Sequence, residues 1–241
     1  IGAFPLNDSK NETADGFISP YEFIEILSRH LSEDDVIIPC SSGGAFTVTM
    51  QAFVPKFGQV IVSNKGLASM GYGLSGAIGA SESTQKRTIL IEGDGGFAQN
   101  LQELGTLAAR QLNIKIFLFS NSGYASIRMT QRNYFQGAYL GCDLETGLGL
   151  PDWSLIARAY GIRYTKLHES KLIETTLVEV LGSPEPEFVE ILIDPEQTYF
   201  PKITSKILPS GEMISNPLHL MTPDISSIEK ERFLPYLLDS I

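Results

Sequence analysis

The chain has 241 residues, 43% of them hydrophobic, and its 18 basic and 28 acidic residues give a net charge of −10. A chain of this length can bury roughly 70 to 75% of the surface of its unfolded form, so we expect one large domain. Lys and Arg gather nowhere as a nucleic-acid partner would require, and no apolar run reaches the roughly 18 residues of a membrane span. Cys40 and Cys142 are far apart and suit a reducing compartment. We therefore expect a soluble, cytoplasmic protein with neither nucleic acid nor membrane as a partner.

The first segment of the chain has the composition of a linker. The first residue is Ile rather than Met, and LNDSKNETADG at 6–16 is polar and has no hydrophobic periodicity. We expect 1–18 to be a linker or arm from a preceding domain, so that the chain begins within a longer protein.

Short apolar runs alternate with helical patterns through residues 19–198. The runs are nearly continuous in apolar residues, as in strands covered on both faces, and predict strands at 35–40, 59–63, 88–92, 114–119, 162–167 and 187–193. Predicted helices span 19–31, 71–80, 100–111, 151–160 and 170–181. This alternation predicts a three-layer α/β/α domain with a doubly wound, mostly parallel six-stranded sheet. Residues 199–241 carry five prolines and little periodicity, so we expect a tail that wraps the domain surface.

One acidic residue stands between glycines at the end of a predicted strand, in IEGDGGFAQN at 91–100. Ligands of an open parallel sheet bind beyond the carboxyl ends of its strands, and Asp94 is at such an end. Asn100, with Glu103 three residues later, is expected to cap the following helix. A right-handed crossover then brings Asn121, which follows the next strand, to the same edge of the sheet.

Asp94, Asn121 and a loop carbonyl near Gly123 are candidate metal ligands. A carboxylate, an amide oxygen and a carbonyl are hard oxygen ligands of the kind that Mg²⁺ accepts, and Mg²⁺ keeps open positions for substrate phosphates. The alternative is structural, with Asp94 capping a helix and Asn121 starting a turn. These residues alone leave both interpretations open.

A longer pattern joins these residues. The order Gly-Asp-Gly, a helix with QELGT, an apolar strand and an Asn runs through GDGGFAQNLQELGTLAARQLNIKIFLFSNSGY at 93–124, and it resembles the thiamine diphosphate fingerprint. GLASMGYGLSGAIGA at 66–80 resembles the segment that precedes this fingerprint in the acetolactate synthase group. The resemblance extends from about Asp35 to Ile193 and is to that group's C-terminal, diphosphate-binding domain.

The resemblance implies thiamine diphosphate and Mg²⁺ as cofactors, with Asp94, Asn121 and the main-chain carbonyl of Gly123 as the Mg²⁺ ligands. It implies that the enzyme decarboxylates a 2-oxo acid, pyruvate by resemblance, and transfers the two-carbon unit to a carbonyl acceptor. Decarboxylation needs the cofactor because the cofactor accepts the electrons that the departing CO₂ leaves behind. Another thiamine diphosphate-dependent decarboxylase or lyase is the alternative, as is a noncatalytic binding module that kept the fold.

The resemblance also assigns residues to the cofactor itself. Gly93 would allow a tight turn, and Gly95 and Gly96 would let the backbone approach the diphosphate. Met70 would be the bulky residue under the bent cofactor, and the carbonyl of Ala68 would accept a hydrogen bond from the 4′-amino group. The further cofactor contacts that it implies are Gly44, Ala45, Phe46, Ser69, Tyr124 and Ala125.

The chain departs from acetolactate synthase in its diphosphate loop. Synthases usually carry Gly-Gln-His where this chain has Gly44, Ala45 and Phe46. Contacts with the diphosphate would then come from backbone N–H groups, or from Ser41 and Ser42.

A second departure follows the predicted metal loop, where Thr130 stands in place of a Trp that shapes the acceptor pocket of synthases. We expect Thr130 to line the substrate pocket and to widen or repolarise it, which favours another acceptor, such as an aldehyde or keto-sugar. Arg128 could face the substrate too, or it could be a solvent-exposed residue of a short helix.

The sequence GYGLSG at 71–76 also spells the G-x-G-x-x-G of dinucleotide-binding folds. In those folds the glycines follow a strand directly, whereas NKGLASM separates this run from the preceding predicted strand. Helix packing therefore explains these small residues better than NAD(P) binding.

No segment resembles the glutamate motif that activates the cofactor's pyrimidine in this family, so we expect no catalytic residue in this chain. The resemblance places that glutamate in a pyrimidine-binding domain of the same protein or of a partner subunit, and it implies a homo-oligomer. We expect the isolated chain to be inactive. Whether FAD is used cannot be judged from these residues.

Overall fold

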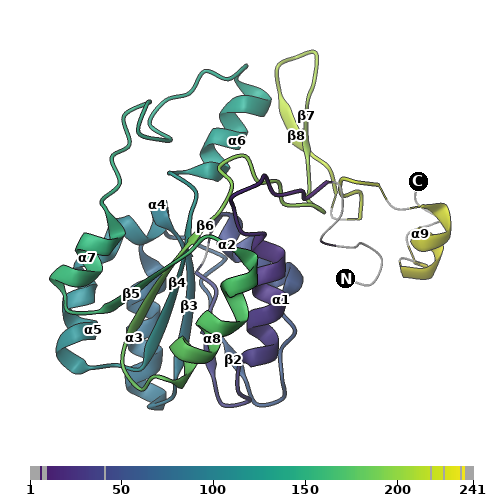
Figure 1. Ribbon diagram of the computed structural model, residues 1–241. Coiled ribbons are helices and arrows are strands. Elements are labelled where there is room, and N and C mark those ends of the chain that lie inside the picture. The colour runs from purple at the N-terminus through teal and green to yellow at the C-terminus, as the bar shows by residue number, and fades with distance from the viewer. Residues whose placement is uncertain are drawn as a thin grey trace. The chain divides into compact units, whose positions relative to one another are not determined.

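A parallel sheet lies at the centre of the larger of two compact units, which comprises residues 13–197 (Figure 1). The structure, a computed structural model, describes residues 6, 10–40, 42–217, 219–224, 226–233 and 235–236. In this part of the chain the sheet has six strands: β1 (Val36–Ile38), β2 (Val60–Ile61), β3 (Thr88–Gly93), β4 (Ile114–Ser120), β5 (Arg163–Leu167) and β6 (Glu187–Leu192). Their order is β2-β1-β3-β4-β6-β5 and every pair is parallel, which confirms the predicted fold class.

Helices cover both faces of this sheet (Figure 1). One face carries α3 (Tyr72–Thr84), α5 (Leu104–Arg110) and α7 (Trp153–Ala159), and the other carries α1 (Pro20–His30), α2 (Gly43–Ala52) and α8 (Ile173–Gly182). Because parallel crossovers are right-handed, the helices change face where the chain turns back from β2 to β3. The order of the strands therefore reverses between β1 and β3, and such a switch point is where open sheets of this kind bind ligands.

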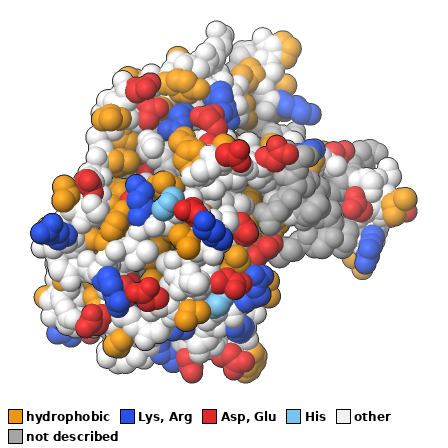
Figure 2. Space-filling view, viewed as in Figure 1, with side chains coloured by type: hydrophobic (Ala, Val, Ile, Leu, Met, Phe, Trp, Pro, Cys, Tyr) orange, Lys and Arg blue, Asp and Glu red, His pale blue; other side chains and the backbone are white. Residues whose placement is uncertain are grey.

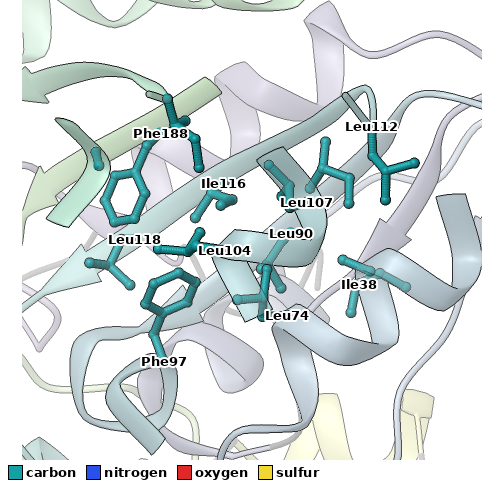
Figure 3. Close-up of a cluster of buried hydrophobic side chains, with 14 of the residues drawn as sticks. Ile38, Leu74, Leu90, Phe97, Leu104, Leu107, Leu112, Ile116, Leu118 and Phe188 are labelled. Atoms are coloured by element: carbon teal, nitrogen blue, oxygen red, sulfur yellow. The ribbon is translucent and has the colours of Figure 1, made fainter. Parts of the chain in front are cut away.

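The inner strands β1, β3, β4 and β6 are buried and largely apolar on both sides because each side packs against helices, whereas the edge strand β2 is exposed. Ile116 and Leu118 of β4 point into the core beneath α3 and α5, where Phe97 packs edge-on against Phe188 at a centroid distance of 5.5 Å (Figure 3). The intervening residue Phe117 points the other way, and its ring packs against that of Phe23 of α1 at a centroid distance of 5.3 Å. This alternation explains the nearly continuous apolar runs from which the strands were predicted.

The helix predicted at 100–111 is interrupted. The chain forms α4 (Asp94–Phe97) and a 3₁₀ segment (Ala98–Glu103) before α5 begins at Leu104, and Asn100 has non-helical backbone angles within that segment. The Asn100 side chain donates to Gly71 O at 3.2 Å and to Ser75 Oγ rather than accepting a hydrogen bond from the N–H of Glu103. The predicted capping pair is therefore wrong, because the amide binds the start of α3 instead.

Two helices lie where none was placed by hydrophobic periodicity. α2 has β-branched residues in its middle and no hydrophobic stripe, and α6 (Ala125–Tyr134) is polar and buries Arg128. Patterns of this kind do not indicate helices. Both helices start directly after the carboxyl ends of strands, which makes them important for the site.

The smaller unit comprises residues 1–12 and 198–241. Its described residues include an antiparallel hairpin of β7 (Ser205–Ile207) and β8 (Met213–Ser215), followed by α9 (Ser227–Phe233). The hairpin was not predicted, and the wrapping of the domain by residues 199–241 stays a prediction.

The described residues show how the charged side chains and the two cysteines are distributed. On the face seen in Figure 2, acidic and basic side chains of the larger unit are interspersed. Cys40 and Cys142 are both buried. None of the described helices is long and apolar enough to cross a membrane.

Candidate functional site

A cavity of about 220 Å³ lies at the carboxyl ends of β1, β3 and β4, at the switch point of the sheet. It is lined by the loops that follow these strands and by the segment before α3. Most residues that the sequence assigned to a cofactor are brought together here, namely Gly44, Ala45, Ala68, Met70, Gly93, Asp94, Gly95, Gly96, Asn121, Gly123, Tyr124 and Ala125. Phe46 and Ser69 do not line it as far as the structure is described.

Two larger clefts lie in the same unit, and the second of them shares Asp94 with this cavity. One of about 740 Å³ is at the amino ends of β5 and β6, and one of about 480 Å³ is beside Asp94 under Trp153. We place the site in the smaller cavity because loops and helix N-termini, rather than volume, decide where an open parallel sheet binds anions.

Asp94 is buried at the start of α4 and accepts backbone N–H groups on both carboxylate oxygens. Oδ1 accepts from Gly95 N at 2.7 Å, and Oδ2 accepts from Asn121 N at 3.0 Å and Gly123 N at 3.2 Å. Burial raises the pKa of Asp94 to about 6, although these N–H donors act in the opposite direction. The predicted meeting of Asp94 and Asn121 at one edge of the sheet is therefore confirmed.

Two further oxygen-bearing groups converge beside this carboxylate. The carboxamide of Asn121 ends 3.3 Å from Asp94 Oδ1 and 3.0 Å from the Gly123 carbonyl oxygen. With its nitrogen turned to them, the amide donates to both oxygens. With its oxygen turned to them, three oxygens face one another, an arrangement that a cation stabilises.

These groups fit the hard-oxygen set that Mg²⁺ accepts, and they include one carboxylate. Within the described ranges, no three or more His, Cys, Asp and Glu side chains gather in a way that could hold a metal ion. A cation here would therefore depend on Asp94 for its charge and on neutral oxygens for the rest.

Gly123 has a conformation and a neighbour that exclude a side chain. Its φ is +134°, and a Cβ there would lie 2.2 Å from the carbonyl oxygen of Cys142. Tyr124 N donates to the same oxygen at 2.8 Å. We call residues 141–147 the covering segment, because it packs directly on the Gly123 loop.

The glycines around Asp94 have different roles from one another. A Cβ on Gly95 would lie 2.3 Å from the ring of Tyr124, so this glycine lets the ring approach the Asp94 turn. Gly93 has an extended backbone with φ −85°, and a Cβ on it would meet no atom within 4 Å, so the passage from β3 into α4 does not require glycine here. Any residue can adopt that φ, since it is an ordinary strand value.

The segment before α3 contains a strained residue. Ala68 has φ +51° in the left-handed region and donates its N–H to Asn64 O at 2.9 Å. A non-glycine residue in this region costs roughly 1 to 2 kcal/mol, and such strain concentrates at functional sites. Met70, two residues later, is 41% exposed beside the cavity.

Helix N-termini border the cavity. Gly44, Ala45 and Phe46 form the first turn of α2, whose N-cap Ser42 makes no side-chain capping bond, and Ala125 begins α6. The free N–H groups of such turns favour anions, including phosphates. Phe46 lies beneath Lys65, whose Nζ is 4.6 Å from the ring centre, and Ser41 lies outside the described residues.

The two residues predicted for a substrate pocket lie on α6. Thr130 donates through Oγ1 to Ser126 O at 3.0 Å. Arg128 is buried, with its guanidinium donating to the carbonyl oxygens of Asn121 and Pro195, so it is not the solvent-exposed residue weighed as the alternative. The substrate-pocket roles of both residues stay predictions.

Glu92 is a site residue to which the sequence reasoning gave no role. It is buried beside the cavity, and within the described structure its Oε2 has no hydrogen-bond partner. A Cβ on Gly73 of α3 would lie 2.2 Å from that oxygen, so this glycine of the G-x-G-x-x-G run serves close packing on Glu92. The signal in the sequence was an acidic residue that ends the apolar run TILIE.

We expect Glu92→Gln to remove a loss of stability that accompanies the rise in pH from 4.5 to about 8. Burial raises the pKa of Glu92 from 4.5 to about 8, so between these values the folded state holds a proton that the unfolded chain has released. The free energy of unfolding therefore falls as pH rises through this window, by at most about 1.4 kcal/mol per pH unit. Urea unfolding of both proteins at about pH 6.5 and pH 8.5, above the pKa of Asp94, measures the difference. An equal loss of stability in both proteins would contradict this expectation.

Comparison with known proteins gives the chain a family. The family model described as "Thiamine pyrophosphate enzyme, C-terminal TPP binding domain" matches residues 42–191. The acetolactate synthase large subunit of Cyanidium caldarium is 34% identical over 143 residues, which are 59% of this chain and 24% of that protein. That of Lactococcus lactis (strain IL1403) is 29% identical over 201 residues, 82% of this chain and 33% of that protein. The chain thus spans about a quarter to a third of these relatives.

A solved structure shows the same fold. The thiamine diphosphate-dependent 4-hydroxybenzoylformate decarboxylase of Rhodococcus jostii RHA1 superposes with a TM-score of 0.66 at 19% identity. The match covers 79% of this chain and 35% of that protein.

Proposed function

The chain belongs to the family of the C-terminal TPP-binding domain of thiamine pyrophosphate enzymes, and from this premise we propose that it binds thiamine diphosphate with Mg²⁺ in the switch-point cavity. The full-length protein would decarboxylate a 2-oxo acid, with pyruvate as the first candidate, and transfer the two-carbon unit to a carbonyl acceptor. The observation that supports this best is the convergence of Asp94, the Asn121 carboxamide and the Gly123 carbonyl.

Each part of the cavity has a role in this proposal. Asp94, Asn121 and Gly123 O bind the metal, and the first turns of α2 and α6 offer N–H groups to the diphosphate. Met70 would support the cofactor, and the carbonyl of Ala68 would accept a hydrogen bond from it. When bound, thiamine diphosphate supplies the electron sink for decarboxylation. The chain's residues would hold the cofactor in one orientation, which lowers the entropic cost of bringing the reacting groups together.

The function is tested on the full-length protein with thiamine diphosphate and pyruvate. We expect CO₂ release that needs added Mg²⁺ and stops when EDTA removes the metal. Metal-dependent binding of the cofactor in calorimetry, without CO₂ release from any 2-oxo acid tried, would favour the noncatalytic binding module instead. Absence of binding would contradict the proposal.

Thr130 supports the proposal that the acceptor differs from that of branched-chain amino-acid synthesis. It lies on α6, which starts at the cavity, and is a small polar residue where synthases carry a ring. We expect Thr130→Trp to shift the ratio of products formed from competing aldehyde and 2-oxo acid acceptors. CO₂ release from pyruvate should stay largely intact, and an unchanged product ratio would argue against this placement.

A pyrimidine-binding domain, in the same protein or a partner subunit, would complete the cavity, and a homo-oligomer would follow. Phe57 and Leu67 are 96% and 83% exposed and come before and after edge strand β2 in the sequence. The residues of β2 are exposed as well. Exposed apolar residues at one edge favour a covered interface. Sedimentation of the full-length protein tests this, since a monomer saturated with cofactor would contradict it.

A further inference from the structure

The guanidinium of Arg128 is a buried charge at the rim of the candidate site. Its side chain is 8% exposed, although α6 is otherwise a polar helix near the surface. A buried charge is costly unless it is paired and hydrogen-bonded, so its partners indicate what the residue does.

The partners of Arg128 come from three connections, namely the loop before α6, the segment after α6 and the distant turn after β6. Nη2 donates to Asn121 O at 3.1 Å, in the loop after β4, and to Pro195 O at 2.9 Å, in the turn after β6. Nη1 lies 3.7 Å from a carboxylate oxygen of Asp143 in the covering segment, and Nε lies 3.6 Å from Glu196. One planar side chain therefore joins all three connections at the carboxyl edge of the sheet.

The covering segment is itself held in place at Asp143. Thr146 Oγ1 donates to Asp143 Oδ1 at 2.7 Å, and Thr146 N donates to the same oxygen at 3.0 Å. In the same segment, the Cys142 carbonyl accepts a hydrogen bond from Tyr124 N. The Asn121–Gly123 loop thus lies between two restraints, the Cys142 carbonyl on one side and the Arg128 guanidinium on the other.

We propose that Arg128 is a positioning residue that fixes the Asn121–Gly123 loop through the Asn121 carbonyl and ties it to the covering segment. It acts through Asn121 and does not contact a ligand itself. What the loop holds rests on the proposed function, whereas the restraint on the loop is a property of this chain alone. Arginine suits the position because its fork reaches two carbonyls and two carboxylates at once, which the single ammonium of lysine cannot do.

Hydrogen exchange in the ligand-free 241-residue chain tests the restraint. We expect Arg128→Met to speed amide exchange by roughly tenfold in peptides that cover 119–126 and 141–148. Exchange in β3 and β6 should stay as in the unsubstituted chain. Arg128→Lys should have a smaller effect in the same peptides. Arg132→Met is the matched control, one turn along α6, because Arg132 is 37% exposed and pairs with Glu196.

Two outcomes of this experiment would overturn the proposal. Unchanged exchange in both peptides would mean that the loop needs no restraint from Arg128. Acceleration of equal size throughout the sheet would make Arg128 a general stabilising residue, and so would an equal effect of Arg132→Met.

A second measurement links the restraint to binding. Calorimetry on the full-length protein with Mg²⁺ and thiamine diphosphate should show affinity lowered roughly 10- to 100-fold by Arg128→Met, the usual effect of losing a residue that orients a metal ligand. Arg128→Lys should recover part of the loss, and Arg132→Met should bind normally. Full affinity in Arg128→Met would overturn the proposal. Failure of the unsubstituted protein to bind would instead contradict the proposed function and leave the exchange result standing.

Discussion

Asp94→Ala is expected to abolish Mg²⁺-dependent binding of thiamine diphosphate, with a loss of more than about 100-fold in affinity. Substitutions of residues that merely orient a metal ligand cost 10- to 100-fold, and Asp94 would be the ligand that carries the charge. The change also leaves the N–H groups of Gly95, Asn121 and Gly123 without their carboxylate acceptor. Calorimetry of the full-length protein with and without Mg²⁺ measures the loss.

Two further variants separate metal binding from folding. Asp94→Asn removes the charge and keeps one oxygen that can accept from the N–H groups of Asn121 and Gly123, although its amide nitrogen cannot accept from Gly95 N. It should therefore be more stable than Asp94→Ala and still fail to bind the metal. Asp34→Ala removes an exposed carboxylate that pairs with Lys86, and it should change nothing at the site. Unchanged affinity for the cofactor in Asp94→Ala would show that the metal is held elsewhere.

The 241-residue chain on its own is expected to fold and to be catalytically silent. Folding follows from the two apolar cores on either side of the sheet, which need no further domain. Catalysis should fail because the resemblance places the activating glutamate in another domain, and general acid–base help of this kind is worth about 10²- to 10⁴-fold in rate. Met70 is exposed in the chain, so the pyrimidine end of the cofactor would also be open to water.

The measurement is CO₂ release from pyruvate with Mg²⁺ and thiamine diphosphate, first by this chain and then by the full-length protein. Circular dichroism and a cooperative thermal transition show whether the isolated chain is folded. Turnover by the folded chain at the rate of the full-length protein would mean that a base lies within residues 1–241.

The fold could be predicted because its inner strands are apolar on both faces. In β4, successive residues such as Phe117 and Leu118 must be apolar since they face different helix layers, and this leaves an unmistakable run in the sequence. The order of such runs then fixes a parallel sheet through right-handed crossovers. The same reasoning brought Asp94 and Asn121 together without any structure.

What could not be predicted depends on contacts between distant segments. α2 shows no hydrophobic stripe in the sequence, because its exposed residues include apolar ones such as Met50. Asn100 meets a capping pattern, but it binds Gly71, 29 residues earlier in the sequence. Glu92 and Arg128 look like ordinary charged residues in the sequence. Their burial appears only when Gly73 packs on one and three loops surround the other.

The single carboxylate at the centre of the site has a consequence for the order of assembly. Asp94 alone balances half of the charge of a divalent cation, and the Asn121 amide and Gly123 carbonyl add none. In the proposed site the diphosphate must supply the remainder, so cation and cofactor would each raise the affinity of the protein for the other by the same factor. Occupancy of the site by thiamine diphosphate would then depend on the concentration of free Mg²⁺ as well as on that of the cofactor. At low free Mg²⁺ the site would be largely empty even where thiamine diphosphate is abundant.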